Sequence, residues 1–273
     1  MIKRGKKGQV TLFIIIAIVV VALGVLAFLF WDNIQTYWMS EEDATTFLQS
    51  QAPSVKGAVN YCVKGTSDTL LRQQGLRAGY YTASNMYALD YAGPKYVVMY
   101  KDDNDFRINR AVSVPMMEGE FSRAMELEGY QRIDSCMQGT LNDLKKKMDV
   151  EVGEKSITAQ INDENIIIKT SWPITLKKGT KAVLELQQDD SEILIPMGNV
   201  LSAANDIINT EANQTSFSSQ YEQYIRSHDL LMSHLKIDIQ NYPTSDQTIY
   251  MLRTVPSRPG EIEYLFNMAV DRS

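Results

Sequence analysis

Two cysteines, Cys62 and Cys136, are the residues of this chain that most directly suggest covalent chemistry. They can form one disulfide bridge, or they can remain as two buried thiols that behave as small hydrophobic side chains. An even number of cysteines in an exported domain favours the bridge, because compartments outside the cytoplasm permit disulfides. The bridge would close a loop of 74 residues, which stabilises a fold by on the order of 4 kcal/mol in the chain-entropy model.

Patterns for other chemistry are absent from the sequence. It contains no phosphate-binding loop, dinucleotide-binding glycine motif, nucleophile elbow or zinc-protease motif. The two histidines, His228 and His234, are six residues apart, a spacing that does not place both on one helical face as metal ligands require. We therefore expect no catalytic residue, no metal site and no cofactor, and we interpret the protein as a non-enzyme. A tethered enzyme with an unfamiliar set of residues is an alternative.

A tyrosine-rich segment is the first candidate for a binding surface. Its tyrosines are Tyr80, Tyr81, Tyr87, Tyr91, Tyr96 and Tyr100. Tyrosine suits contact surfaces because its rigid apolar ring carries a polar tip. We identify Tyr80, Tyr81, Tyr87 and Tyr91 as the candidate contact surface; the alternative is a set of half-buried positions in strands and loops.

A modification site is predicted at Asn213. Asn213-Gln214-Thr215 is a sequon for N-linked glycosylation and follows a helical stretch in a polar segment. The alternative is a chance occurrence of this short pattern.

The charged residues are unevenly distributed. The first 31 residues contain four cations and no acid, whereas Asp32 to Ser273 contains 23 basic and 33 acidic residues, a net charge of −10. Binding to nucleic acid needs clustered lysine and arginine. The acidic body therefore argues against a nucleic-acid partner.

An uncharged run from Val10 to Trp31 follows a basic cytoplasmic leader at residues 1–9. As a helix this run would be roughly 33 Å long, enough for a bilayer core. We expect a transmembrane helix over residues 10–31, with the lipid bilayer as a partner. The positive-inside rule then places the N-terminus in the cytoplasm and the C-terminal domain outside the cell. The predicted location is thus the cell membrane, in a single pass. A cleaved secretory signal is an alternative.

The stretch Lys6-Lys7-Gly8-Gln9-Val10-Thr11-Leu12-Phe13 resembles the class III signal peptide of archaeal type IV pilin-like proteins. The resemblance covers only the N-terminal segment of the chain. It implies a prepilin peptidase as a partner, cleavage between Gly8 and Gln9, and assembly with copies of the same chain through the N-terminal helix. Phe13 stands at the fifth mature position, where bacterial pilins carry glutamate; archaeal relatives commonly lack that glutamate too.

Residues 32–52 predict a helical stalk that ends at Ala52-Pro53, where the proline should stop a helix. This stalk could continue the N-terminal helix. The alternative is a break at Ser40, which is a good N-cap for a separate helix.

Residues 53–273 predict an extracytoplasmic α+β domain in which helices pack on antiparallel β-hairpins. Alternating residues favour a hairpin with its turn at Asn162–Asn165 and a further strand at 181–188. A helical pattern covers 196–236, and a second hairpin surrounds the Pro-Ser-Arg-Pro-Gly turn at 256–260. Residues 62–79 and 136–153 also share a faint repeat, which predicts two related helix-and-turn elements or reflects coincidence.

These observations lead to two hypotheses about function. The first is a non-enzymatic, membrane-anchored cell-surface protein, with a pilin-like or minor-pilin structural subunit as the specific form. The second is a membrane-tethered extracellular module that recruits a ligand or partner protein.

Overall fold

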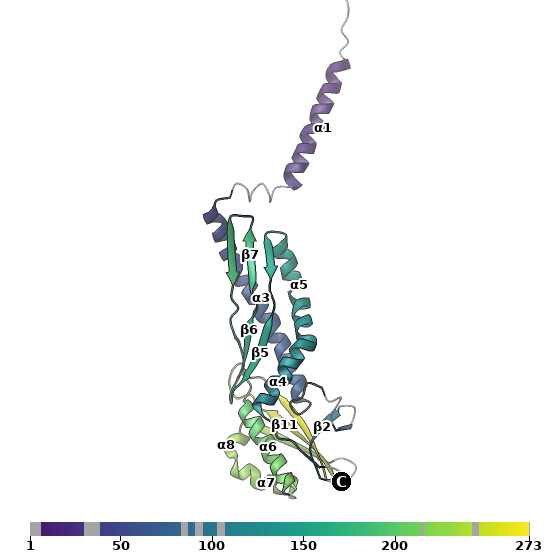
Figure 1. The fold of residues 1–273 in the computed structure, drawn as a ribbon, viewed down its shortest axis with the longest axis vertical. Coiled ribbons are helices and arrows are strands. Elements are labelled where there is room, and N and C mark those ends of the chain that lie inside the picture. The colour runs from purple at the N-terminus through teal and green to yellow at the C-terminus, as the bar shows by residue number, and fades with distance from the viewer. Residues whose placement is uncertain are drawn as a thin grey trace, which may run out of the picture. The chain divides into compact units, whose positions relative to one another are not determined.

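The computed structural model describes residues 7–29, 39–82, 87–90, 95–102, 107–213, 216–241 and 246–272. The protein belongs to the α+β class (Figure 1). Its residues divide into two compact units, which are described separately here. The first unit comprises Met1–Val55, Gly139–Val152 and Ile174–Leu186. The second comprises Lys56–Gln138, Gly153–Pro173 and Gln187–Ser273.

Helix α1 spans Lys7–Leu29. Its side chains described from residue 15 onward are largely isoleucine, valine, leucine and phenylalanine, and they are exposed to solvent on every side of the helix. A polar face is missing because no polar or charged residue interrupts the sequence between Phe13 and Leu29.

The predicted transmembrane helix over residues 10–31 is corrected by the structure. Helix α1 begins inside the basic leader, at Lys7, and residues 30 and 31 lie outside the described part of the chain. Among the helices in the described ranges, none combines the length and the apolar character needed to cross a bilayer. The α+β part of the predicted fold class agrees with the structure, and the membrane span does not.

Helix α3 spans Glu41–Gly75. The Ser40 hydroxyl accepts a hydrogen bond of 3.1 Å from the backbone N–H of Asp43, so the helix has the N-cap at Ser40 that the sequence offered as the alternative. The predicted stop at Ala52-Pro53 is wrong, because α3 continues through Pro53. Burial of apolar residues on both sides of the proline, Leu48 and Val55 among them, offsets the lost backbone hydrogen bond.

The first unit contains a small antiparallel sheet in the order β4-β7-β8. Its strands are Asp149–Val152, Ile174–Lys178 and Ala182–Leu186. Ile174 and Leu176 of β7 are buried, as are Ala44 and Leu48 of α3. The predicted strand at 181–188 is confirmed as β8.

The second unit contains the sheet β5-β6-β9, formed by Ser156–Ile161, Ile166–Ser171 and Ser191–Ile193. Strands β5 and β6 pair from Ser156↔Ser171 to Ile161↔Ile166, which confirms the predicted hairpin and its turn. Alternate residues of β5 are buried, as the alternating pattern requires.

A six-stranded sheet forms the other half of the second unit, in the order β1-β2-β12-β11-β10 with β3 beside β2. The strands are Ala88–Asp90, Lys95–Asp102, Arg107–Asn109, Leu235–Asn241, Gln247–Thr254 and Leu265–Asp271 for β1, β2, β3, β10, β11 and β12. The hairpin of β11 and β12 confirms the predicted C-terminal hairpin. Leu235, expected in a helix, instead begins strand β10.

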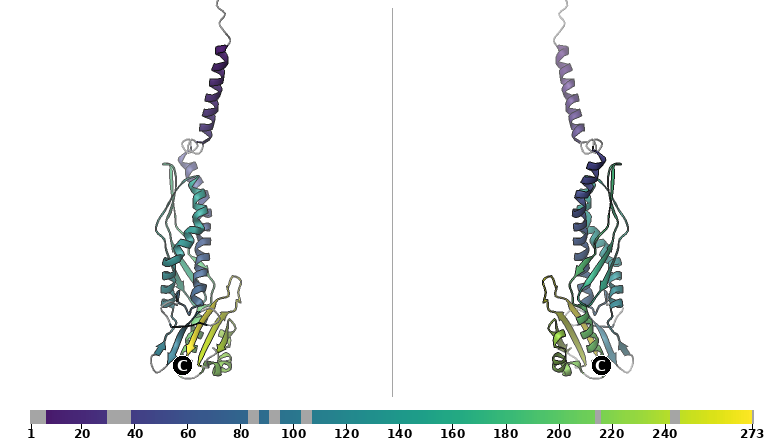
Figure 2. Two further views of the ribbon diagram at one scale, coloured as in Figure 1. Left: turned by 90° about the vertical axis from the view of Figure 1, so that its right-hand side faces the viewer. Right: turned by 90° about the vertical axis from the view of Figure 1, so that its left-hand side faces the viewer.

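Helices complete the second unit. Helix α4 (Val114–Ala124), the π-helical turn η1 (Met125–Gly129) and helix α5 (Tyr130–Lys145) follow one another directly, and α5 belongs to this unit up to Gln138. Helices α6 (Met197–Ala212), α7 (Phe217–Ser227) and α8 (Asp229–Met232) lie beside the C-terminal strands (Figures 1 and 2). Helix α6 packs on β2, β11 and β12 and closes the core of that sheet.

Candidate functional site

The two cysteines form the predicted disulfide. Cys62 of α3 and Cys136 of α5 are bridged, with 5.8 Å between their Cα atoms. The bridge therefore joins residues of two helices that are far apart in sequence, and both cysteines belong to the second unit. Neither sulfur is a free thiol, so the bridge contributes to stability and offers no nucleophile.

Tyr80 and Tyr81 follow the end of α3 and are half-buried. The backbone N–H of Tyr81 donates a hydrogen bond of 2.9 Å to Glu120, and its carbonyl accepts one from the Arg77 guanidinium. Burial raises the pKa of both tyrosine hydroxyls above the ordinary value. These contacts integrate the two residues into the fold around α4.

Tyr87 takes part in a polar cluster at the C-terminal ends of β2 and β12, two inner strands of the six-stranded sheet. Its hydroxyl donates to Asp271 Oδ2 at 2.9 Å, and the Lys101 ammonium lies 3.1 Å from the same oxygen. The ammonium also lies 4.9 Å from the centre of the Tyr87 ring. Tyr91 lies outside the described residues. Of the tyrosines predicted as one contact surface, the three described are thus held by contacts within the fold: Tyr81 by Glu120 and Arg77, Tyr87 by Asp271 and Lys101, and Tyr80 by partial burial.

The predicted processing and modification sites lie at helix ends. Gly8 and Gln9 belong to the first turn of α1. Asn213 is the C-cap of α6, and its backbone N–H donates to the carbonyl of Asn209 at 3.2 Å. The other two residues of its sequon are outside the described part.

The histidines have local roles. The His228 ring stacks on Tyr224 with 4.2 Å between ring centres, and its Nδ1 lies 3.0 Å from the Ser227 hydroxyl. The carbonyl of His234 accepts from the N–H of Val255. Within the described ranges, no three His, Cys, Asp or Glu side chains lie close enough to hold a metal ion together.

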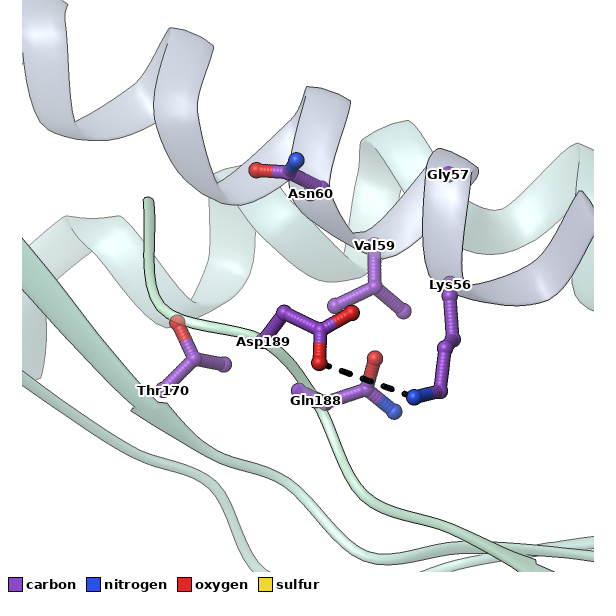
Figure 3. Close-up of a pocket in the computed structure, with 7 residues that line it drawn as sticks. All are labelled: Lys56, Gly57, Val59, Asn60, Thr170, Gln188 and Asp189. Carbon is purple, nitrogen blue, oxygen red and sulfur yellow. Dashed lines mark ion pairs between the residues drawn. The ribbon is translucent and has the colours of Figure 1, made fainter. Parts of the chain in front are cut away.

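A polar pocket of about 190 Å³ lies between α3 and the segment that enters β9 (Figure 3). Its lining comprises Lys56, Gly57, Val59, Asn60, Thr170, Gln188 and Asp189. All of these residues belong to the second unit. The pocket is smaller than the sites of 300–1,000 Å³ that enclose drug-sized ligands. It has room for a ligand fragment such as one sugar ring or one side chain.

The charges in this pocket balance. The Lys56 ammonium and an Asp189 carboxylate oxygen are 3.7 Å apart, and the aspartate is 78% exposed. Such an exposed pair is weak and can open at little cost. Since one cation faces one anion, the pocket has no net charge to attract a strongly charged ligand.

The hydroxyl of Thr170 is the unusual group of the pocket. Its oxygen is buried and, in the part of the chain that the structure describes, has no hydrogen-bond partner. Figure 3 shows Thr170 on the strand side of the pocket, opposite Asn60 of α3. A buried hydroxyl without a partner costs about 1–3 kcal/mol. Because this oxygen is shielded from solvent, a ligand in the pocket would meet other atoms of the threonine and not its hydroxyl.

A second, more apolar groove of about 290 Å³ lies next along α3. It is lined by Tyr61, Lys64, Gly65, Asp68, Ile193, Leu194, Gly260 and Ile262. Tyr61 is 79% exposed, so its ring is accessible from solvent. The Ser191 hydroxyl, at the start of β9, donates a hydrogen bond to Asn60 of α3. Asn60 lines the pocket and directly precedes Tyr61, which lines the groove. We call the pocket and the groove together the α3 seam.

The turn at 256–260 supports the groove. The Glu261 carboxylate accepts hydrogen bonds from the backbone N–H groups of Ser257 at 2.6 Å and Arg258 at 3.0 Å. These bonds, the Ser257 one foremost, lower the pKa of Glu261 to about 2. The turn thereby fixes Gly260 and Ile262, which line the groove.

The side chains of the seam are of the kinds that bind a ligand. Amide, hydroxyl, ammonium and carboxylate groups meet in the pocket, while its one ammonium is paired with a carboxylate. Sequence reasoning did not identify any residue of the seam. The features of the sequence that could have indicated the seam are two glycines of α3, Gly57 and Gly65, which lie on the same helical face as Tyr61. A Cβ atom at either glycine would meet open space.

Comparison with protein-family models, curated proteins and solved structures finds no match to the chain.

Proposed function

We propose that this protein is a non-enzymatic, pilin-like structural subunit that works outside the cytoplasm and assembles with copies of itself through α1. The observation that carries the proposal is the apolar surface of α1. Ile18 and Val20 are more than half exposed, and Phe28 is 81% exposed. A helix that is apolar all round is stable in water only when other apolar groups cover it.

Copies of α1 are the cover that we favour. An amphipathic helix would need one partner on one side, whereas the side chains of α1 are apolar in every direction. A helix surrounded by several other copies of α1 would have these faces buried together, which a single partner could not achieve. The resemblance of the first residues to a class III signal supports the same proposal, with a prepilin peptidase as the processing partner.

The disulfide supports an extracytoplasmic location for the second unit. Cys62 and Cys136 account for every cysteine of the chain, and both are in the bridge. Structural disulfides persist in oxidising compartments and are rare in the cytosol.

The test compares the full chain with a chain that begins at Gln9. Both are purified in a mild detergent, the detergent is removed, and the products are examined by electron microscopy and sedimentation. We expect ordered assemblies from the chain that begins at Gln9, because the leader charges no longer prevent packing of α1.

Two variants control this test. Ile18→Asp places a charge in the proposed interface and should leave the protein unassembled. Val183→Asp places a charge at an equally exposed valine on β8 and should have no effect. Assembly that is insensitive to Ile18→Asp, or no assembly at all, would refute the proposal. Partition of the unassembled chain into added lipid vesicles would also count against it.

A further inference from the structure

We propose that the α3 seam is a binding site for a short neutral saccharide. The inference does not depend on assembly through α1, because every residue of the seam belongs to the second unit. It rests on the charge balance of the pocket, its two hydrogen-bonding amides and the exposed Tyr61 ring.

The charge of the pocket selects a neutral ligand. A phosphate, a sulfate or an acidic peptide would face Asp189 as well as Lys56, and a basic ligand would face Lys56 as well as Asp189. Either class of charged ligand would be attracted by one of these two side chains and repelled by the other. A neutral polar molecule meets no such repulsion.

The hydrogen-bonding groups of the pocket match sugar hydroxyls. The Asn60 side chain offers its amide N–H groups, because its oxygen already accepts from the Ser191 hydroxyl. The Gln188 side chain offers its amide oxygen, because its nitrogen already donates to the Trp172 carbonyl at 3.4 Å. A sugar hydroxyl is both donor and acceptor, so it can pair with either amide.

The groove supplies the apolar part of saccharide recognition. Tyr61 follows Asn60 directly on α3, so the aromatic ring and the amide lie at adjoining parts of the seam. The ring is 79% exposed and thus accessible to a ligand. One face of a pyranose ring is lined by C–H groups, which pack on an aromatic ring, while the hydroxyls point to the sides. A saccharide of two units could occupy the pocket with one ring and the groove with the other.

Glycines leave the entrance open. A Cβ atom at Gly57, in the pocket, or at Gly65, in the groove, would meet nothing within 4 Å. A larger side chain at either position would therefore fill the site without a clash in the fold. In a helix the replacement of glycine also stabilises the backbone. These positions allow a blocking variant that does not damage the protein.

The experiment is saturation-transfer NMR on the full chain with a panel of neutral saccharides: glucose, galactose, mannose and N-acetylglucosamine, with their 1,4-linked disaccharides. A zwitterionic detergent keeps α1 covered. Glycoside detergents are avoided because their headgroups are themselves neutral saccharides. We expect saturation transfer to at least one saccharide of the panel at millimolar concentration.

The variants locate the binding. Tyr61→Ala and Gly65→Leu should each weaken it at least tenfold, whereas Tyr61→Phe keeps the ring and should retain it. The matched control is Gly139→Leu on α5, since Gly139 is also a helical glycine with open space at its Cβ and does not line the seam. Thermal unfolding of each variant, measured in parallel, identifies a loss of binding that is caused by unfolding.

Three outcomes would overturn the proposal. The first is no saturation transfer from any saccharide of the panel. The second is binding that Tyr61→Ala and Gly65→Leu leave unchanged while both variants remain folded. The third is competition at the seam by a charged peptide or an anionic saccharide that binds more tightly than every neutral one.

Discussion

Helices α1 and α3 show two different solutions for an apolar sequence. In α3 the large apolar side chains Leu48, Leu70 and Leu71 are fully buried, and the opposite face is polar. In α1 the apolar side chains described from residue 15 onward are exposed in all directions. Helix α3 thus finds its packing partners within its own chain. Helix α1 requires partners beyond the residues that surround it in the structure.

The same comparison separates structural from interacting features within α3. Its buried stripe and Cys62 stabilise the fold, whereas Tyr61, next to that cysteine, is among the most exposed aromatic residues described. The predictions below test this division, beginning with the largest effect.

Removal of the disulfide should have the largest effect on stability. The variant Cys62→Ala/Cys136→Ala opens a loop of 74 residues and should lower the free energy of unfolding by on the order of 4 kcal/mol. Urea denaturation followed by tryptophan fluorescence measures the change, with Trp172 as a buried reporter. Reduction of the unmodified protein should give the same shift, and the double variant should not respond to a reducing agent. A shift of less than about 1 kcal/mol would show that the bridge is not a major constraint on this fold.

Truncation of one leucine on each helix tests the comparison directly. Leu70→Ala on α3 creates a cavity and should lower the free energy of unfolding by about 2–5 kcal/mol. Leu23→Ala on α1 should leave the unassembled protein unchanged, because Leu23 is 59% exposed and loses few contacts. Denaturation of both variants under conditions that prevent assembly gives the two values. Similar losses at the two positions would mean that α1 is packed within the single chain.

The Glu261 carboxylate should give a smaller, pH-dependent effect. Its pKa is about 2 in the folded protein and 4.5 in the unfolded reference. A lowered folded-state pKa stabilises the protein above the unfolded value, and this contribution is lost as the pH falls from 4.5 towards 2. Glu261→Gln should lower stability by about 1 kcal/mol at neutral pH and should remove this part of the acid sensitivity.

Stability curves between pH 2 and pH 7 for the wild type and Glu261→Gln make this comparison. The two curves should converge at low pH. Parallel curves across the whole range would contradict the assigned role of the turn.

The smallest effect on stability is expected at Thr170. Thr170→Val replaces a buried hydroxyl without a described partner by a methyl group of similar size, so the free energy of unfolding should rise or stay within about 0.5 kcal/mol. Thermal unfolding measures it. A loss above about 1 kcal/mol would mean that the hydroxyl has a structural partner.

Local patterns in the sequence predicted local structure well. The hairpin of β5 and β6 was predictable because alternating residues and the Asn162–Asn165 turn act over a few neighbouring positions. The disulfide was predictable from cysteine number and context. Pro53 was misleading, since tertiary packing of α3 outweighs its local tendency to end a helix. Leu235 was misassigned because its spacing from preceding apolar residues fits a helix, although it opens a strand.

The α3 seam could not be predicted from the sequence. Its central contact joins Asn60 to Ser191, which are 131 positions apart. The seam exists only after the helix and the β9 segment have come together, and local residue patterns do not specify that pairing. The exposure of Tyr61 is likewise a property of the folded unit. Its residue type alone does not distinguish it from Tyr100, which is buried in β2.

The central claim is that the exposed apolar surface of α1 is covered by copies of α1. The most direct measurement is sedimentation of the chain that begins at Gln9 after detergent removal, beside the same chain with Ile18→Asp. The account predicts large, ordered assemblies for the first and a monomer for the second, with the same unfolding midpoint when both are kept unassembled in detergent. Monomers in both samples, or equal assembly in both, would contradict it.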